Sequence, residues 1–120
     1  MKTIFRRSLI AIDLGAARTR IYIDGKLVLE EPSAITVNMK NGKVVYSGQA
    51  VFVLRESPSY YKTYRVKDNP EDLWVIRKML QSFMRRVRWR HLIWRPVVAF
   101  AIDLDTTEEM KEALRNMVIS

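Results

Sequence analysis

"LIAIDLGAARTRIYIDGKLVLEEPSAITV", residues 9–37, is the stretch of sequence that decides the fold. Its first four residues form a continuous apolar run, and this run ends at Asp13 and Gly15. Such a pattern is typical of a buried strand that leads into a tight loop. Residues 18–23 then alternate between the two faces of a strand, with Thr19, Ile21 and Ile23 on one face. This alternation predicts a second, half-buried strand.

Turn residues divide the following sequence into further strands. Asp24-Gly25 favours the positive φ angles of a two-residue hairpin turn, so residues 26–29 should return as an antiparallel strand. Asn41-Gly42 separates two more candidate strands, residues 34–37 and 44–46. Residues 48–55 are compatible with a short helix. Residues 57–69 have no clear period and are interpreted as a connection.

The strongest helix prediction covers residues 71–87. Asn69 is the expected N-cap, Pro70 stands at the first helical position, and acidic residues follow in the first turn. Apolar residues recur at spacings of three and four to give one stripe: Leu73, Ile76, Leu80, Phe83, Met84 and Val87. We interpret Met79 and Met84 as packing residues.

The order of elements predicts the fold class. The apolar run 97–102 indicates a central strand, and Thr106 with Glu109 forms a capping box ahead of a second helix. Antiparallel hairpins are thus followed by helix, strand and helix. We expect an α/β fold with a mixed sheet covered by helices, in a single domain over residues 1–120.

Composition and charge restrict the function classes. The chain has 120 residues, 48% of them hydrophobic, and no cysteine, which excludes disulfides and thiolate metal sites. No apolar run approaches the roughly 20 residues that span a bilayer, so we expect a cytoplasmic protein. The formal charge is +8, and residues 73–102 contain seven basic and no acidic residues. Such a block predicts attraction to a polyanion, either nucleic acid or an anionic lipid surface.

Several of these segments together resemble a known family. "IAIDLGAARTRIYIDGKLVLEEPSAITV", "GKVVYSGQA", "RPVVAFAI" and "TTEEMKEALRNMV" are similar to the N-terminal part of MreB, the rod-shape-determining bacterial actin, in the superfamily of actins, sugar kinases and large heat-shock chaperones. The resemblance implies an RNase H-like fold, here a partial actin-like subdomain without the second lobe. It also implies a homo-oligomer or association with a full-length bacterial-actin filament, and a sheet with an unpaired edge.

The resemblance implies a phosphate-binding loop for ATP and Mg²⁺ in a degenerate form. The family pattern Asp-Leu-Gly-Thr-Ala-Asn-Thr corresponds here to Asp13, Leu14, Gly15, Ala16, Ala17, Arg18 and Thr19. Ala16 lacks the hydroxyl donor, Arg18 introduces a charge, and a later Pro-Ser-Gly turn is replaced by Asp103-Leu104-Asp105. In the family the second phosphate loop, the adenosine-binding segment and the helix with the catalytic carboxylate follow beyond the part that this chain resembles. We therefore expect weak or absent nucleotide binding and no ATPase activity from this chain alone. Glu30 and Glu31 should end a strand at the surface without a chemical role.

A second implication concerns "RWRHLIWRP", residues 88–96. MreB proteins commonly carry a short apolar protrusion at this position that inserts into the inner face of the membrane. Tryptophan prefers the interface, aliphatic side chains add buried area, and arginine stems reach anionic headgroups. The expected membrane-binding residues are Arg88, Trp89, Arg90, Leu92, Ile93, Trp94 and Arg95. The alternative is that Trp89 and Trp94 cover the hydrophobic core while the arginines are solvated. In either case, His91 is expected to be a packing or interfacial residue and not a metal ligand.

Two other function classes remain open from the sequence. In an RNase H-like nuclease, Asp13, Asp103 and either Glu71 or Asp72 would converge on Mg²⁺ while the basic stretch holds a phosphate backbone. In non-catalytic nucleic-acid binding, residues 77–95 would track the backbone and Trp89 would stack on a base. This third interpretation leaves Leu92, Ile93 and Trp94 unexplained, so we expect no nucleic-acid partner.

Overall fold

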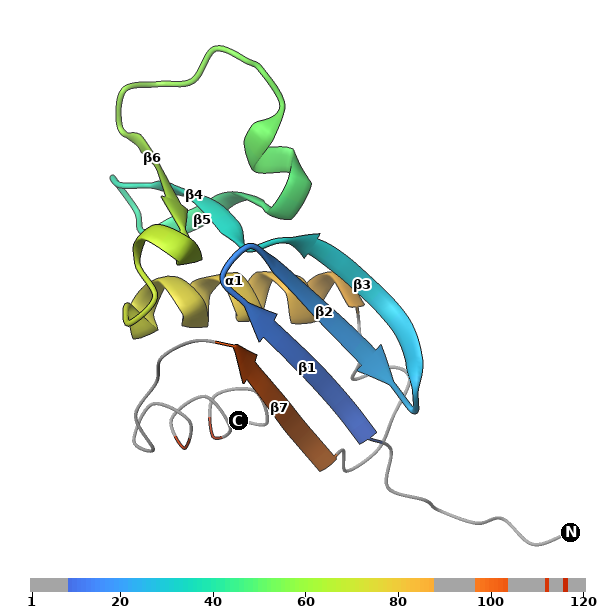
Figure 1. The fold of residues 1–120 in the computed structure, drawn as a ribbon. Coiled ribbons are helices and arrows are strands. Elements are labelled where there is room, and N and C mark those ends of the chain that lie inside the picture. Colours follow the sequence, from blue (N-terminus) through green and yellow to red (C-terminus); the bar gives the residue numbers. More distant parts are fainter. Residues whose placement is uncertain (1–8, 88–96, 104–111, 113–115, 117–120) are drawn as a thin grey trace, which may run out of the picture.

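The structure is a computed structural model that describes residues 9–87 and 97–103, together with Glu112 and Asn116 (Figure 1). Its elements follow the chain in this order: β1 (Leu9–Gly15), β2 (Arg18–Ile23), β3 (Lys26–Pro32), β4 (Ala34–Asn38), β5 (Lys43–Ser47), the 3₁₀ helix η1 (Gly48–Phe52), β6 (Tyr61–Arg65), the 3₁₀ helix η2 (Val66–Asp68), α1 (Leu73–Val87) and β7 (Val97–Asp103). Of the second predicted helix, only Glu112 and Asn116 are described, and both are helical.

The larger sheet is mixed, as predicted. Its strand order is β3-β2-β1-β7, with antiparallel pairing through β3, β2 and β1 and parallel pairing of β1 with β7 (Figure 1). Asp24 at φ 49° and Gly25 at φ 82° form the predicted hairpin turn. The prediction of a central strand at 97–102 was wrong within the described residues, where β7 lies at the end of the order. A continuous apolar run is typical of a strand that is buried on both faces, but Ala99 and Ala101 are exposed, and their small size let the run look fully buried.

A second, smaller sheet has the order β5-β4-β6 and is antiparallel. The hairpin around Gly42, at φ 72°, was predicted, but β6 and η2 were not, because residues 57–69 were interpreted as connection. The sequence of β6, "YKTYR", leaves each of its residues exposed or half-buried. Such an edge strand has no apolar alternation for sequence reasoning to detect.

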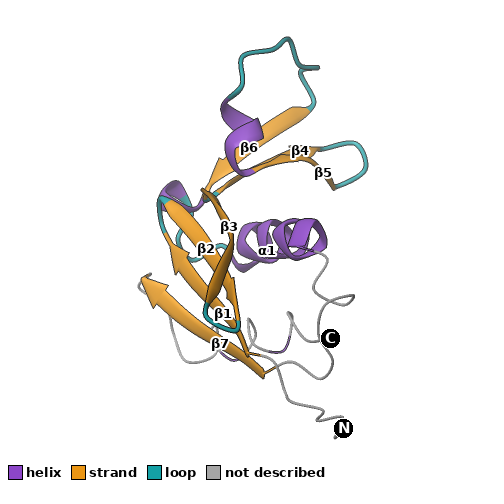
Figure 2. Cartoon of the chain, turned by 90° about the vertical axis from the view of Figure 1, so that its right-hand side faces the viewer, coloured by secondary structure: helices purple, strands orange, loops and turns teal. Residues whose placement is uncertain are grey.

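α1 packs on one side of the larger sheet and beneath the smaller one (Figure 2). Its buried residues are Val75, Ile76, Met79, Leu80, Phe83 and Met84, which confirms the predicted stripe and the packing role of both methionines. They meet a sheet face formed by Ile10, Ile12, Leu14, Ile21 and Leu29, and β4 adds Ile35 and Val37. One apolar core therefore serves both sheets.

The start of α1 differs from the prediction. The Asp72 carboxylate accepts a hydrogen bond from the Val75 N–H at 3.2 Å, so Asp72 is the N-cap. The Asn69 side chain instead donates to the Arg65 carbonyl at 2.9 Å and closes the preceding 3₁₀ turn. Asn and Asp are both good N-cap residues. Here Asn69 to Asp72 form a turn that contains Pro70 and Glu71, so the helix begins after this turn.

Along the chain, the two sheets are joined by one residue, Ser33, which lies between β3 and β4. Ser33 is 3% exposed, and each of its polar groups forms a hydrogen bond inside the protein. On one side it contacts the β1–β2 turn, and on the other its carbonyl accepts a hydrogen bond from the Val66 N–H at 3.0 Å.

Within the described residues, no helix is long and apolar enough to cross a membrane.

Candidate functional site

The predicted phosphate loop is the tight turn between β1 and β2, with Ala16 and Ala17 at its tip. The backbone comes very close to itself here. A Cβ added at Gly15 would lie 2.7 Å from the Arg18 carbonyl oxygen, a distance that real Cβ contacts do not reach. Gly15 is therefore required for space and not for an unusual φ angle.

Ser33 holds this turn from below. Its N–H donates to the Ala17 carbonyl at 2.9 Å, and its hydroxyl donates to the Gly15 carbonyl at 2.7 Å. The Ser33 oxygen also lies 2.8 Å from the hydroxyl oxygen of Thr19, which is fully buried. Because the Ser33 proton is used toward Gly15, Thr19 donates to Ser33. The "EPS" motif thus shapes the loop, a role that sequence reasoning missed.

These contacts determine which groups of the loop are left for a ligand. The N–H groups of Ala16 and Ala17 have no acceptor in the part of the chain that the structure describes. Backbone N–H groups at such a turn form a concave anion site. The buried Thr19 hydroxyl, by contrast, is engaged by Ser33 and supports the loop from inside. Arg18 is exposed at the start of β2.

Asp13 lies two residues before the loop glycine, and its carboxylate is already paired. Arg20 is its register partner on β2, and Arg20 Nη1 lies 3.4 Å from Asp13 Oδ2. Arg20 Nε donates to the Glu30 carboxylate on β3, and this hydrogen bond holds the pKa of Arg20 above its usual value. Sequence reasoning missed Arg20. The two-residue turn fixes the register of β1 and β2, so pairing positions outward from Ala16 and Ala17 would have found it.

Glu31 was expected at the surface without a role, and the structure corrects this. Its side chain is 14% exposed, pairs with Arg86 of α1, and accepts from the Gln49 N–H of η1 at 2.9 Å. Burial opposes ionisation of Glu31, but the hydrogen bonds from Arg86 and Gln49 outweigh it and lower the pKa of the carboxyl group. Glu31 therefore ties β3 to α1 and to η1, which follows β5.

The acidic residues of the nuclease hypothesis do not assemble into a metal site in the described residues. No group of three carboxylate or histidine side chains that could hold a metal occurs among them. Asp13 is paired with Arg20, and Asp72 caps α1. Asp103 is the register partner of Gly15 on β7, and its side chain lies outside the described part.

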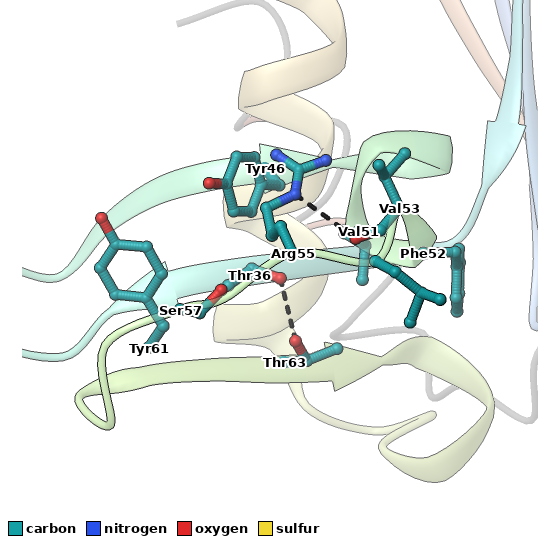
Figure 3. A pocket seen from close by; sticks show the side chains of 10 residues that line it. Thr36, Tyr46, Val51, Phe52, Val53, Arg55, Ser57, Tyr61 and Thr63 are labelled. Carbon is teal, nitrogen blue, oxygen red and sulfur yellow. Dashed lines mark hydrogen bonds between the residues drawn. The ribbon is translucent and has the colours of Figure 1, made fainter.

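A cavity of about 360 Å³ lies on the smaller sheet, away from the predicted site (Figure 3). Its polar groups already bind one another: Thr36 and Thr63 share a hydrogen bond of 2.9 Å, and Arg55 donates to the Val53 and Ala50 carbonyls. Arg55 also lies over the Tyr46 ring, 4.0 Å from its centre. These contacts hold the segment after η1 against the sheet, and we assign this cavity no ligand.

The predicted membrane-binding residues Arg88, Trp89, Arg90, Leu92, Ile93, Trp94 and Arg95 lie outside the described residues. α1 leads directly into this segment, because it ends at Val87.

Comparison with known proteins identifies the family. The family model described as MreB/Mbl protein matches residues 7–120. The chain belongs to the MreB/Mbl family. It is 29% identical over 119 residues to the cell shape-determining protein MreB of Pasteurella multocida, covering 92% of this chain and 34% of that protein. It is 29% identical over 110 residues to Mbl of Bacillus subtilis, covering 88% of this chain and 33% of that protein. The chain thus spans about a third of the length of these MreB/Mbl relatives.

Solved structures of the family have the same fold. MreB5 of Spiroplasma citri bound to AMPPNP matches with a TM-score of 0.74 at 22% identity, over 97% of this chain and 36% of that one. The ADP-bound structure of MreB5 matches with a TM-score of 0.73 at 23% identity, over 94% of this chain and 35% of that one. The predicted partial actin-like subdomain is confirmed.

Proposed function

We propose that this chain is a cytoskeletal, cell-shape module of the bacterial-actin type. It associates with other filament subunits and with the inner face of the membrane from the cytoplasm. The observation that carries this proposal is the MreB/Mbl match over residues 7–120, because it includes the fold, the phosphate loop and the segment proposed for the membrane.

The phosphate loop supports weak nucleotide binding. MreB5 of Spiroplasma citri is known with AMPPNP and with ADP, and here the Ala16 and Ala17 N–H groups are the contacts left for phosphate oxygens. Ala16 offers no hydroxyl, and the Thr19 hydroxyl is bound to Ser33. Since an actin-type site lies between two lobes, we expect no ATP turnover from these 120 residues alone.

The membrane proposal rests on the residues that follow α1. Burying Trp89, Leu92, Ile93 or Trp94 in the interface contributes about 1.5 to 3 kcal/mol each, and each nearby arginine adds about 1 kcal/mol on an anionic surface. One copy would bind weakly. Several copies in a polymer would bind firmly through avidity.

Sedimentation with vesicles containing anionic lipid tests this function. The wild-type chain should pellet with the vesicles, and Leu92→Ser/Ile93→Ser/Trp94→Ser should remain in solution. Raised salt should weaken binding by the wild type without abolishing it, because apolar burial is insensitive to screening. A matched control is Phe52→Ser/Val53→Ser/Leu54→Ser, which removes three exposed apolar side chains at the end of η1 and directly after it. This variant should still pellet with the vesicles.

Other outcomes would redirect the proposal. If neither the wild type nor the control pellets, the membrane part is wrong. Metal-dependent cleavage of an RNA-DNA hybrid, or salt-sensitive retention on single-stranded nucleic acid, would favour the classes that the basic stretch left open. Light scattering of the chain at raised concentration tests the subunit association. A strictly monomeric chain would contradict it.

A further inference from the structure

The β1–β3 face opposite α1 carries a row of three charged residues. Asp13, Arg20 and Glu30 come from β1, β2 and β3, and each is the register partner of the next. Arg20 uses Nη1 toward Asp13, at 3.4 Å, and Nε toward Glu30. One guanidinium thus serves two carboxylates, and Glu30 fixes its orientation next to Asp13.

Asp13 is also the first residue of the loop for which the family resemblance implies ATP and Mg²⁺. The surrounding residues do not fit that ion. Divalent magnesium needs several oxygen ligands and usually a free carboxylate. Here the Asp13 carboxylate is already engaged by Arg20, and a second guanidinium, that of exposed Arg18, begins β2 directly after the loop.

We infer that Arg20 takes the place of the divalent cation at Asp13, so that the phosphate loop of this chain works without Mg²⁺. The guanidinium neutralises the Asp13 carboxylate, which would otherwise repel a phosphate group. A fixed positive charge on the protein thereby replaces an exchangeable one. The statement about phosphate rests on the proposed nucleotide site, whereas the statement about the metal rests on the Asp13–Arg20 pair alone.

A titration with Mn²⁺ alone tests the inference on the full chain. Mn²⁺ broadens the NMR signals of nearby amides, so the signals of Gly15, Ala16 and Ala17 report binding at Asp13. The wild type should show no saturable broadening there. Arg20→Leu should gain it, with an apparent affinity higher by on the order of tenfold or more, because an opposite charge beside a carboxylate competes with the ion.

Two further variants separate pairing from overall charge. Arg18→Leu removes the same charge from the same strand without removing the partner of Asp13, and it should behave like the wild type. Arg20→Leu/Asp13→Asn should lose the gained broadening, which assigns the metal to Asp13. If Arg20→Leu does not fold, as judged from the rest of its spectrum, Arg20→Gln keeps a polar side chain of similar length without the charge.

Saturable broadening in the wild type equal to that of Arg20→Leu would overturn the inference. An absence of broadening in both Arg20→Leu and Arg20→Gln would also overturn it.

A second titration, with AMPPNP in EDTA or in Mg²⁺, tests whether the loop binds phosphate without Mg²⁺. The chemical shift changes at Ala16 and Ala17 should be the same in both buffers. Shifts that need Mg²⁺ would overturn it. A complete lack of shifts would contradict the proposed nucleotide site and leave the result with Mn²⁺ alone standing.

Discussion

Removing the Ser33 hydroxyl should destabilise the protein by more than a surface substitution would. In Ser33→Ala the Gly15 carbonyl loses its donor at 2.7 Å, and the Thr19 hydroxyl, fully buried, loses its acceptor at 2.8 Å. A protein hydrogen bond contributes about 0.5 to 1.5 kcal/mol net, and a buried group left without a partner costs about 1 to 3 kcal/mol. We expect a loss of about 2 kcal/mol in the free energy of unfolding.

Urea unfolding measures this loss. For a small domain with a slope of about 1 to 3 kcal/mol per molar, the midpoint should fall by roughly 1 M at unchanged slope. Ser59→Ala, in an exposed turn of the same chain, is the matched control and should change the free energy by less than about 0.5 kcal/mol.

A double-mutant cycle tests the hydrogen-bond chain itself. Thr19→Val removes the buried hydroxyl while keeping the shape of the side chain. If Thr19 donates to Ser33, then Thr19→Val/Ser33→Ala should be less destabilised than the sum of the single variants, by about 1 kcal/mol. A Ser33→Ala loss below about 0.5 kcal/mol, or strict additivity in the cycle, would refute the reasoning.

Three further perturbations follow from the same structure. Gly15→Ala forces a Cβ to within 2.7 Å of the Arg18 carbonyl and should cost about 1 to 3 kcal/mol in urea unfolding, with the largest amide shifts in the loop; a neutral effect would mean that the turn opens freely. Glu31→Gln removes the pair with Arg86 and should cost about 1 kcal/mol at pH 7, since Arg86 is partly exposed. Folding lowers the pKa of Glu31. Its contribution to the free energy of unfolding is therefore complete above a pH of about 4.3, the ordinary pKa of glutamate, and is lost as the pH falls through the lower pKa of the folded state. Stability measured against pH should therefore separate the wild type from Glu31→Gln at neutral pH and bring them together in acid. Phe83→Ala, at a fully buried position of α1, should cost about 3 to 5 kcal/mol and so unfold much of the population under mild denaturant.

Local chemistry was sufficient to predict the hairpins and the helix stripe. Asp24-Gly25 and Gly42 adopt the positive φ angles that their turns require, and the apolar residues of α1 face the core. The β6 strand could not be predicted in this way, because none of its side chains is buried and its sequence shows no alternation of apolar and polar residues. Its strand conformation comes from pairing with β4, which is a tertiary effect.

The turn that carries the candidate phosphate loop was predicted from the sequence, whereas its role as a binding site stays a prediction. The Asp13-to-Thr19 pattern located the loop. Arg20 and Ser33 decide what the loop can do, and each acts across strands, so their roles depend on register and not on neighbours in sequence. The helix cap shows the same limit. Asn69 and Asp72 are both suitable, and the choice between them depends on how the preceding 3₁₀ turn closes.

The position of Ser33 between the two sheets has a thermodynamic consequence. The same residue binds the turn at Gly15 and Ala17 and accepts from Val66 beyond the smaller sheet, so displacement of either side changes the hydrogen bonds of the other. A ligand that shifted the loop and a contact that shifted η2 would therefore both change the hydrogen bonds of Ser33. Any coupling between the two would be reciprocal, so measuring it in one direction would give both.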